Sequence, residues 1–348
     1  MAMTAAVIAA GCSWVGGMPD PAAPLTPPTT LCRQETAGPC REAAEVEALL
    51  RDPGLTVLGS DEPSEGIQGA RILTLLVPRA DGDVVFRAKW RANATRTVIN
   101  SPRKELAAHE MQKLFLPVDD YVVPPASGHC FELDHYHAMV DAEAEPLENT
   151  RCVFGVLSYW LEDVQSLDDA EDDDVLRRER LYDPALFERN ETYRRSLANV
   201  NLLAYLIRHG DTHPGQFVVT SNEEHPRVYS VDNSLSFGAP QNTQLTYEQN
   251  WSHIHVPALP QSSVERLRVL SKQDIARLGV FEQYEKRADL LVPVEPEAPR
   301  GDTEAAMRWV DDGRQLQLGL MEAEVAAVWE RVGELLSRIG STGEPELF

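Results

Sequence analysis

The order of apolar and polar positions predicts a first half rich in β-strands. Ile72 to Val77 is an apolar run of strand-forming residues, Asp81-Gly82 is a hairpin turn signal, and Val84 to Trp90 is the returning strand. Two further strands are predicted, one at Cys130 to Val140 and one at Cys152 to Trp160. These segments together indicate a small, strand-rich lobe.

Four other segments have the spacing of apolar residues that is typical of helices. Three of them are Glu42 to Arg51, Lys104 to Leu116 and Tyr193 to Arg208. After the third helix, two short strands are predicted at 217–220 and 228–232. The fourth and clearest helix places seven apolar side chains on one face: Val325, Val328, Trp329, Val332, Leu335, Leu336 and Ile339.

Composition divides the chain into three parts. Residues 13–40 are rich in Pro, Gly, Thr and Ala, which is typical of a tether, so we assign 1–40 to a leader and tether. The acidic run Asp168 to Asp174 marks a shift in composition and is predicted to be a solvated loop. We therefore assign the strand-rich lobe to 41–163 and a helical lobe to 164–345.

Net charge limits the partners that we expect. The chain has 348 residues and a net charge of −23. Such an acidic protein gains nothing from counterion release on DNA, so we expect no nucleic-acid partner. The same sign argues against charge-driven binding to anionic lipid. The sequence has no apolar run of about 18 residues, so we expect no membrane-spanning helix.

The N-terminal residues favour export. Ala5 to Gly11 is a run of small and apolar residues directly before Cys12, and it resembles a bacterial lipobox. The resemblance implies cleavage before Cys12, lipidation of that residue and anchoring in a bacterial envelope. The usual positively charged region is absent before this run, and a cytoplasmic protein is the alternative.

The other cysteines agree with export. They are four in number: Cys32, Cys40, Cys130 and Cys152. Disulfides between Cys32 and Cys40 and between Cys130 and Cys152 are natural pairings in an oxidising compartment. Four buried thiols in a cytosolic protein are the alternative.

The densest cluster of polar residues is His209 to Gln216, and Asp232 follows in a second polar segment. Phosphoryl transfer needs one carboxylate to orient the attacking hydroxyl, and Asp211 fits this role. A second carboxylate and a side-chain amide must hold Mg²⁺ against the phosphates of a nucleotide. Gln216 and Asp232 fit these roles, since Mg²⁺ prefers oxygen ligands.

The first polar segment reads Asp-x-His-x-Gly-x and is followed by an apolar strand, and the second reads Asp-Asn-x-x-x-Phe-Gly. These motifs resemble those of the atypical kinases, a group that includes the phosphatidylinositol 3-/4-kinases, the HipA toxins and the secreted Golgi protein and sugar kinases. The run His-Gly-Asp-x-His-Pro-Gly is equally similar to the aminoglycoside and choline kinases. Both groups imply an α+β, bilobal protein-kinase-like fold with a strand-rich N-lobe and a helical C-lobe.

The first lobe supplies the partners that this resemblance implies. Lys89 resembles the strand lysine that contacts the nucleotide phosphates, and Glu105 resembles the helix glutamate that pairs with it. Arg87 lies on the same strand face and is an alternative to Lys89. Glu110 is an alternative to Glu105. Residues 64–69, with two glycines, could cover the phosphates.

Three positions depart from the atypical kinases. His209 replaces an asparagine two residues before the catalytic aspartate, Thr212 replaces an arginine after it, and Gln216 replaces an asparagine at the metal-binding position. The resemblance implies an ATP- and Mg²⁺-dependent phosphotransferase that acts on a protein, a sugar or a small molecule. The alternative is a weak or inactive pseudokinase, an exported lipoprotein that binds nucleotide or serves as a scaffold.

Four of the five site residues also have a structural interpretation. Asp211 could be a turn residue or a helix cap, and Asp232 with Asn233 could form an Asx-turn. Lys89 could be a surface lysine of a strand. Glu105 could be an acid in the first turn of a helix, where the helix dipole favours it. The spacing of Asp211 and Asp232 and the strands beside them favour function.

Overall fold

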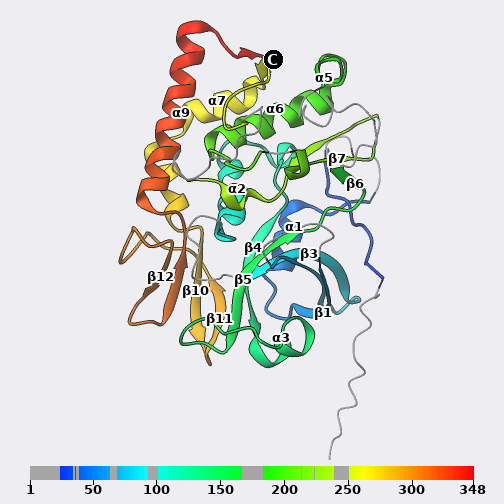
Figure 1. The fold of residues 1–348 in the computed structure, drawn as a ribbon, viewed down its shortest axis with the longest axis vertical. Helices are drawn as coiled ribbons and strands as arrows, with labels where there is room; N and C mark the ends of the chain where they lie inside the picture. Colours follow the sequence, from blue (N-terminus) through cyan, green and yellow to red (C-terminus); the bar gives the residue numbers. More distant parts are fainter. Residues whose placement is uncertain are drawn as a thin grey trace, which may run out of the picture.

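The computed structural model describes residues 24–33, 36, 39–62, 69–92, 101–166, 183–212, 214–222, 224–238 and 251–348. It is an α+β fold with several antiparallel sheets (Figure 1). The predicted lipidation site Cys12, most of the predicted phosphate-covering loop (residues 64–68) and the acidic run 168–174 lie outside these ranges.

A five-stranded antiparallel sheet lies in the lower half of Figure 1. Its order is β1-β2-β3-β5-β4, and its strands are β1 (Thr56–Asp61), β2 (Arg71–Val77), β3 (Val84–Ala92), β4 (Ala126–Glu132) and β5 (Cys152–Tyr159). Side chains alternate between the two faces of a strand. On β3, Phe86, Ala88 and Trp90 are fully buried on one face, while Lys89 points to the other.

The prediction of one strand over Cys130 to Val140 is wrong in its second half. β4 ends at Glu132, and helix α3 (Leu133–Met139) follows. The side chain of Glu132 accepts a hydrogen bond from His135 N at 3.1 Å and caps this helix. The apolar pattern could not show this change, because a short amphipathic helix and a strand share apolar positions over so few residues.

The two predicted disulfides are confirmed. Cys130 in β4 is bonded to Cys152 in β5, and Cys32 is bonded to Cys40. The segment around the Cys32–Cys40 bond also contacts the rest of the fold, since the guanidinium of Arg33 lies 5.5 Å from the ring centroid of Tyr229. The described residues between 24 and 33 are therefore attached to the fold, whereas we predicted a tether up to residue 40.

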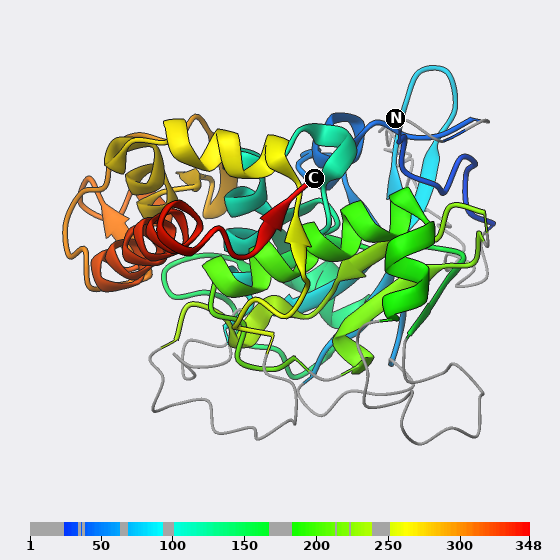
Figure 2. The same ribbon diagram turned by 90° about the horizontal axis from the view of Figure 1, so that it is seen from above.

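The predicted helices are confirmed with small changes at their ends. They are α1 (Ala43–Leu50), α2 (Arg103–Phe115), α6 (Glu191–Leu206) and α9 (Glu322–Thr342). The structure adds α5 (Pro184–Arg189), α7 (Gln261–Val269) and α8 (Lys272–Ala276). Figure 2 shows α6 in the middle of the helical part, with α7 and α9 to one side. None of the helices in the described ranges is both long enough and apolar enough to span a bilayer.

A small three-stranded sheet brings together strands that are far apart in the sequence. Its order is β6-β7-β8, and its strands are β6 (Val164–Ser166), β7 (Phe217–Thr220) and β8 (Val228–Ser230). β6 follows closely after β5, while β7 follows α6, so this sheet connects the five-stranded sheet with α6 along the chain. The strands β7 and β8 form an antiparallel hairpin in which Phe217 pairs with Ser230.

A four-stranded sheet lies within the region that we predicted to be a helical lobe. Its order is β11-β10-β13-β12, and its strands are β10 (Glu282–Arg287), β11 (Leu290–Val294), β12 (Met307–Val310) and β13 (Gln315–Leu318). Pro293 lies on the edge strand β11, where its missing N–H costs no ladder bond. A parallel pair, β9 (Ala258–Leu259) with β14 (Glu346–Leu347), closes the C-terminus.

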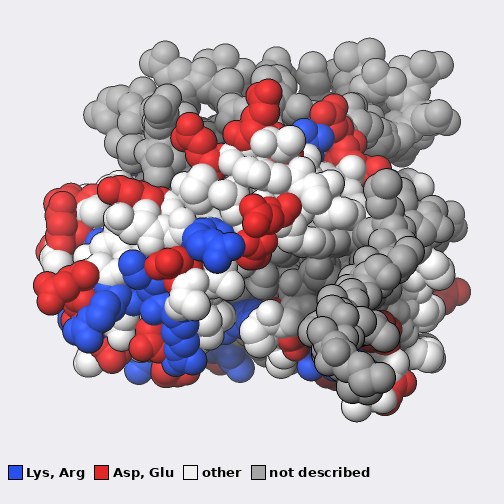
Figure 3. All heavy atoms as spheres, turned by 90° about the horizontal axis from the view of Figure 1, so that it is seen from below, with Lys and Arg blue, Asp and Glu red and all other residues white. Residues whose placement is uncertain are grey.

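A buried carboxylate joins this four-stranded sheet to the larger one. Glu282 in β10 accepts hydrogen bonds from Ser127 Oγ at 2.8 Å and from Gly128 N at 2.8 Å, both in β4. Arg51, directly after α1, pairs with the same carboxylate at 3.1 Å. A side chain at Gly128 would overlap both Glu282 and Tyr284, so the close approach needs glycine. On the surface around the four-stranded sheet, Lys and Arg are interleaved with Asp and Glu (Figure 3).

Candidate active site

The loops that carry the two predicted carboxylates lie side by side at one end of the β7–β8 hairpin. Val231 N donates a hydrogen bond to Gln216 O at 2.9 Å, which extends the hairpin by one step. Gly210 N donates to Leu235 O at 3.1 Å and joins the loop after α6 to the loop after β8. Asp211 directly follows Gly210, and Asp232 directly follows Val231. The backbone therefore brings the two loops together.

Asp211 is held by the two polar residues that flank it. Gln216 Nε2 donates to Asp211 Oδ2 at 3.2 Å, and Asp211 N donates to His209 Nδ1 at 3.2 Å. His209 is fully buried, and its ring fixes the backbone of the loop. Thr212 is also buried, and its hydroxyl accepts from Trp251 N at 3.2 Å. Two of the departures from the kinase pattern, His209 and Thr212, thus have structural roles around Asp211.

Lys89 lies between two carboxylates from different elements. Its Nζ is 3.2 Å from Glu105 Oε1 in α2 and 3.1 Å from Asp232 Oδ2 after β8. Glu105 Oε2 accepts a hydrogen bond from Asn233 N at 2.9 Å, so this glutamate holds the second loop as well. The Glu105 side chain is 6% exposed and that of Asp232 is 37% exposed. Asp232 is thus the carboxylate of this group that solvent and a ligand can reach.

Electrostatics keep Lys89 and Asp232 charged. Burial alone would lower the pKa of Lys89, but the nearby Glu105 and Asp232 carboxylates raise it above its ordinary value. Burial opposes ionisation of Asp232, yet Lys89, the Ser234 hydroxyl and Arg91 hold the pKa of Asp232 well below its usual range. Burial and the neighbouring Asp232 carboxylate raise the pKa of Glu105 above its ordinary value, although Lys89 opposes the rise. Asp232 is therefore a carboxylate at neutral pH and a competent oxygen ligand for Mg²⁺.

The structure also places the two alternative residues. Arg87 lies beside Glu162, with 3.7 Å between NH1 and Oε1. Glu110 accepts from Lys113 Nζ at 2.7 Å, one turn and a half further along α2 than Glu105. Of the candidate cations Lys89 and Arg87 and the candidate glutamates Glu105 and Glu110, Lys89 and Glu105 form the ion pair. Lys89 also pairs with Asp232.

A second group of possible metal ligands lies between α1 and α2, where no motif in the sequence indicates one. Glu47, His109 and Glu110 each offer a ligand atom within 4.8 Å of the others. The ammonium of Lys113 already lies 2.8 Å from Glu47 and 2.7 Å from Glu110, so it forms an ion pair with both carboxylates. Burial opposes ionisation of Glu47, but His109 and Lys113 lower its pKa to about 2. This group is an ion network that joins two helices.

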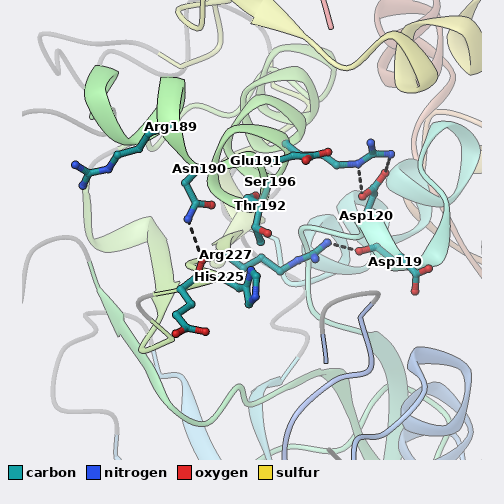
Figure 4. Close-up of a pocket in the computed structure, with 11 residues that line it drawn as sticks. Asp119, Asp120, Arg189, Asn190, Glu191, Thr192, Ser196, His225 and Arg227 are labelled. Carbon is teal, nitrogen blue, oxygen red and sulfur yellow. Dashed lines mark hydrogen bonds and ion pairs between the residues drawn. The ribbon is translucent and has the colours of Figure 1, made fainter. Parts of the chain in front are cut away.

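A cavity of about 380 Å³ lies at the other end of the β7–β8 hairpin, next to the start of α6 (Figure 4). Its polar groups bind each other: Arg195 forms two hydrogen bonds with Asp120 at 2.7 and 2.6 Å, and Asn190 Nδ2 donates to Glu224 O at 3.0 Å. The five predicted site residues all lie in the described ranges, and none of them lines this cavity.

The chain matches no protein-family model, and no curated protein is similar to it. The motifs in the sequence and the geometry around Lys89, Asp211 and Asp232 are therefore the features that point to a function.

Proposed function

We propose that this protein is an ATP- and Mg²⁺-dependent phosphotransferase of the atypical kinase type. In this proposal residues 41–163 are the N-lobe and 164–345 the C-lobe of a bilobal kinase-like fold. The observation that carries the proposal is the position of Lys89, within 3.2 Å of Glu105 and 3.1 Å of Asp232. Protein kinases need a strand lysine paired with a helix glutamate and an aspartate that holds the metal.

The residues of the site have separate roles in the proposed reaction. Asp211 orients the acceptor hydroxyl and takes its proton. Lys89, kept in place by Glu105, contacts the nucleotide phosphates. Asp232 and the side-chain oxygen of Gln216 offer hard oxygen ligands for Mg²⁺, which when bound supplies positive charge against the phosphates. The acceptor is an alcohol group of a protein, a sugar or a small molecule.

We further propose that the protein is exported and anchored through a lipid on Cys12 in a bacterial envelope. The bonds Cys32–Cys40 and Cys130–Cys152 support export, because disulfides persist in oxidising compartments.

One observation favours a second function, that of a pseudokinase that binds nucleotide or acts as a scaffold. The amide of Gln216 donates to Asp211, so the proposed metal ligand also restrains the proposed base. If this hydrogen bond persists with nucleotide bound, Asp211 cannot turn to an acceptor.

ADP release from Mg·ATP by the purified protein tests the proposed function. We expect Asp211→Asn to lower turnover by about 10²- to 10⁴-fold, because that side chain can no longer take a proton. Glu224→Gln, in the separate cavity, is the control and leaves turnover unchanged. Equal turnover in the wild type and in Asp211→Asn would remove Asp211 from the mechanism. A thermal shift with Mg·ATP but no turnover would favour the pseudokinase.

A further inference from the structure

Arg103, the first residue of α2, is a buried cation at a position where helices disfavour positive charge. The helix macrodipole favours anions in the first turn and cations in the last. The side chain of Arg103 is nevertheless only 3% exposed, and it lies two residues before Glu105, the proposed partner of Lys89. A buried charge at such a position needs a partner that offsets both the lost hydration and the dipole.

The C-terminal part of the chain supplies that partner. Arg103 NH2 lies 2.9 Å from Glu324 Oε1, and Arg103 NH1 donates to Gly319 O at 3.3 Å. Glu324 is in the first turn of α9, where the helix dipole favours a carboxylate, and its side chain is 6% exposed. The two charged residues are 221 positions apart in the sequence, so their ion pair joins two distant parts of the fold.

The groups that hold Arg103 are fixed by their own neighbours. Glu324 Oε2 accepts a hydrogen bond from Met321 N at 2.9 Å, while Oε1 faces Arg103. A side chain at Gly319 would overlap the backbone of Gly279, so these two segments are in close contact. The carboxylate and the carbonyl therefore hold the guanidinium in one place.

The first turn of α2 is also the part of this helix that meets the candidate active site. Ser101 N, just before the helix, donates to Ser234 O at 3.3 Å, and Glu105 Oε2 accepts from Asn233 N at 2.9 Å. Both bonds reach the loop after β8. A displacement of this turn would move Glu105 relative to Lys89, whose Nζ lies 3.2 Å from Glu105 Oε1.

We propose that Arg103 and Glu324 are positioning residues, through which α9 holds the first turn of α2 so that Glu105 stays paired with Lys89. This inference rests on the proposed function and adds a requirement to it. Arg103 and Glu324 act through Glu105, without contact to the nucleotide. The start of α9 is thus needed for full turnover as well as for folding.

Turnover of radiolabelled Mg·ATP by full-length variants tests the inference. We expect Arg103→Met to lower kcat at least about tenfold, because a shift of about 1 Å in a positioned group can cost about a hundredfold. In protein that already carries Glu105→Gln, the same change should lower kcat by less than about twofold more, because the residue through which it acts is gone. A merely structural role for Arg103 predicts the same factor in both backgrounds.

Asp120→Asn is the matched control. Asp120 also forms a largely buried ion pair, with 2.6 Å to Arg195, but it lies beyond the other end of α2. Its loss should lower the midpoint of urea unfolding and leave kcat of the folded protein within about twofold of the wild type.

A double variant keeps the test open if Arg103→Met does not fold. Arg103→Met with Glu324→Met leaves no member of the pair as an unpaired buried charge, and apolar replacements of buried ion pairs often preserve stability. It removes the fixed geometry of the pair, so we expect kcat to fall at least about tenfold here too.

Two results would overturn the inference while leaving the proposed function intact. One is a kcat of Arg103→Met, or of the double methionine variant, equal to that of the wild type. The other is a loss of the same size with Glu105 and with Glu105→Gln. If the wild type releases no ADP from Mg·ATP, the proposed function itself is wrong and the inference with it.

Discussion

Lys89 in β3 and Glu105 in α2 form an ion pair with 3.2 Å between Nζ and Oε1. This pair joins the sheet to a helix from the next part of the chain, and Glu105 continues the connection to the backbone of Asn233. The position of α2 therefore helps to hold the loop with Asp232, to which Lys89 is also joined directly, with 3.1 Å between Nζ and Asp232 Oδ2.

Loss of the Lys89 ammonium should weaken nucleotide binding. We expect Lys89→Met to lower the affinity for Mg·ATP at least about tenfold, because a hydrogen bond to a charged group contributes about 1.5–3 kcal/mol. Isothermal titration calorimetry would measure this affinity. Arg87→Met is the control on the same strand face, and its surface ion pair with Glu162 predicts a change of less than about threefold. Equal losses in both variants would assign the effect to general charge rather than to Lys89.

The disulfide between β4 and β5 should contribute to stability. Cys130 and Cys152 are 22 residues apart, so their bond restricts a loop of the unfolded chain. We expect Cys130→Ala with Cys152→Ala to lower the free energy of unfolding by about 3 kcal/mol, measured by urea denaturation without reductant. Mass measurement of alkylated protein from its own host would show whether the bonds form there. Free thiols at all four positions would contradict both the pairing and the proposed export.

His129 should make the fold less stable in weak acid. Burial in β4 lowers the pKa of its imidazole from 6.5 to about 4, although a hydrogen bond with the Leu50 backbone and the charge of Asp52 oppose this shift. Between these two pH values the unfolded chain binds a proton that the folded protein excludes. The contribution is therefore complete above pH 6.5 and falls as the pH drops to about 4.

The size of this loss reaches roughly 3 kcal/mol, from the difference between the two pKa values. The midpoint of urea unfolding, measured between about pH 7 and pH 4.5, would report this loss of stability. The lower limit of about pH 4.5 is chosen to limit the titration of carboxylates. His129→Gln should remove most of the slope, because its side chain does not titrate. An unchanged slope in this variant would assign the acid sensitivity to other groups.

Local patterns predicted the elements that carry the candidate site. The alternation in β3 placed Lys89 on the face opposite Ala88 and Trp90, and the spacing in α2 placed Glu105 in its first turn. The hairpin between Gln216 and Asp232 was visible because both strands are apolar and the turn is polar. These features depend on neighbours in the sequence, so one sequence is sufficient to find them.

Other features depend on contacts between distant parts of the chain. The four-stranded sheet was missed because its strands are short and Pro293 suggested a break, while pairing across β10 decides their structure. Arg91 was overlooked because its relation to Asp232 exists only after β3 and the loop after β8 meet. The period of two along β3 was the available signal, since it puts Arg91 on the face of Lys89.

The most direct measurement is a crystal structure of the protein with Mn²⁺ and a non-hydrolysable ATP analogue, using the anomalous signal of manganese to locate the ion. Our account predicts an ion within about 2.3 Å of oxygens from Asp232 and Gln216, with analogue phosphates beside Lys89. An ion at Glu47 and Glu110, or an analogue in the cavity beside Arg195, with nothing bound at Asp232, would contradict it.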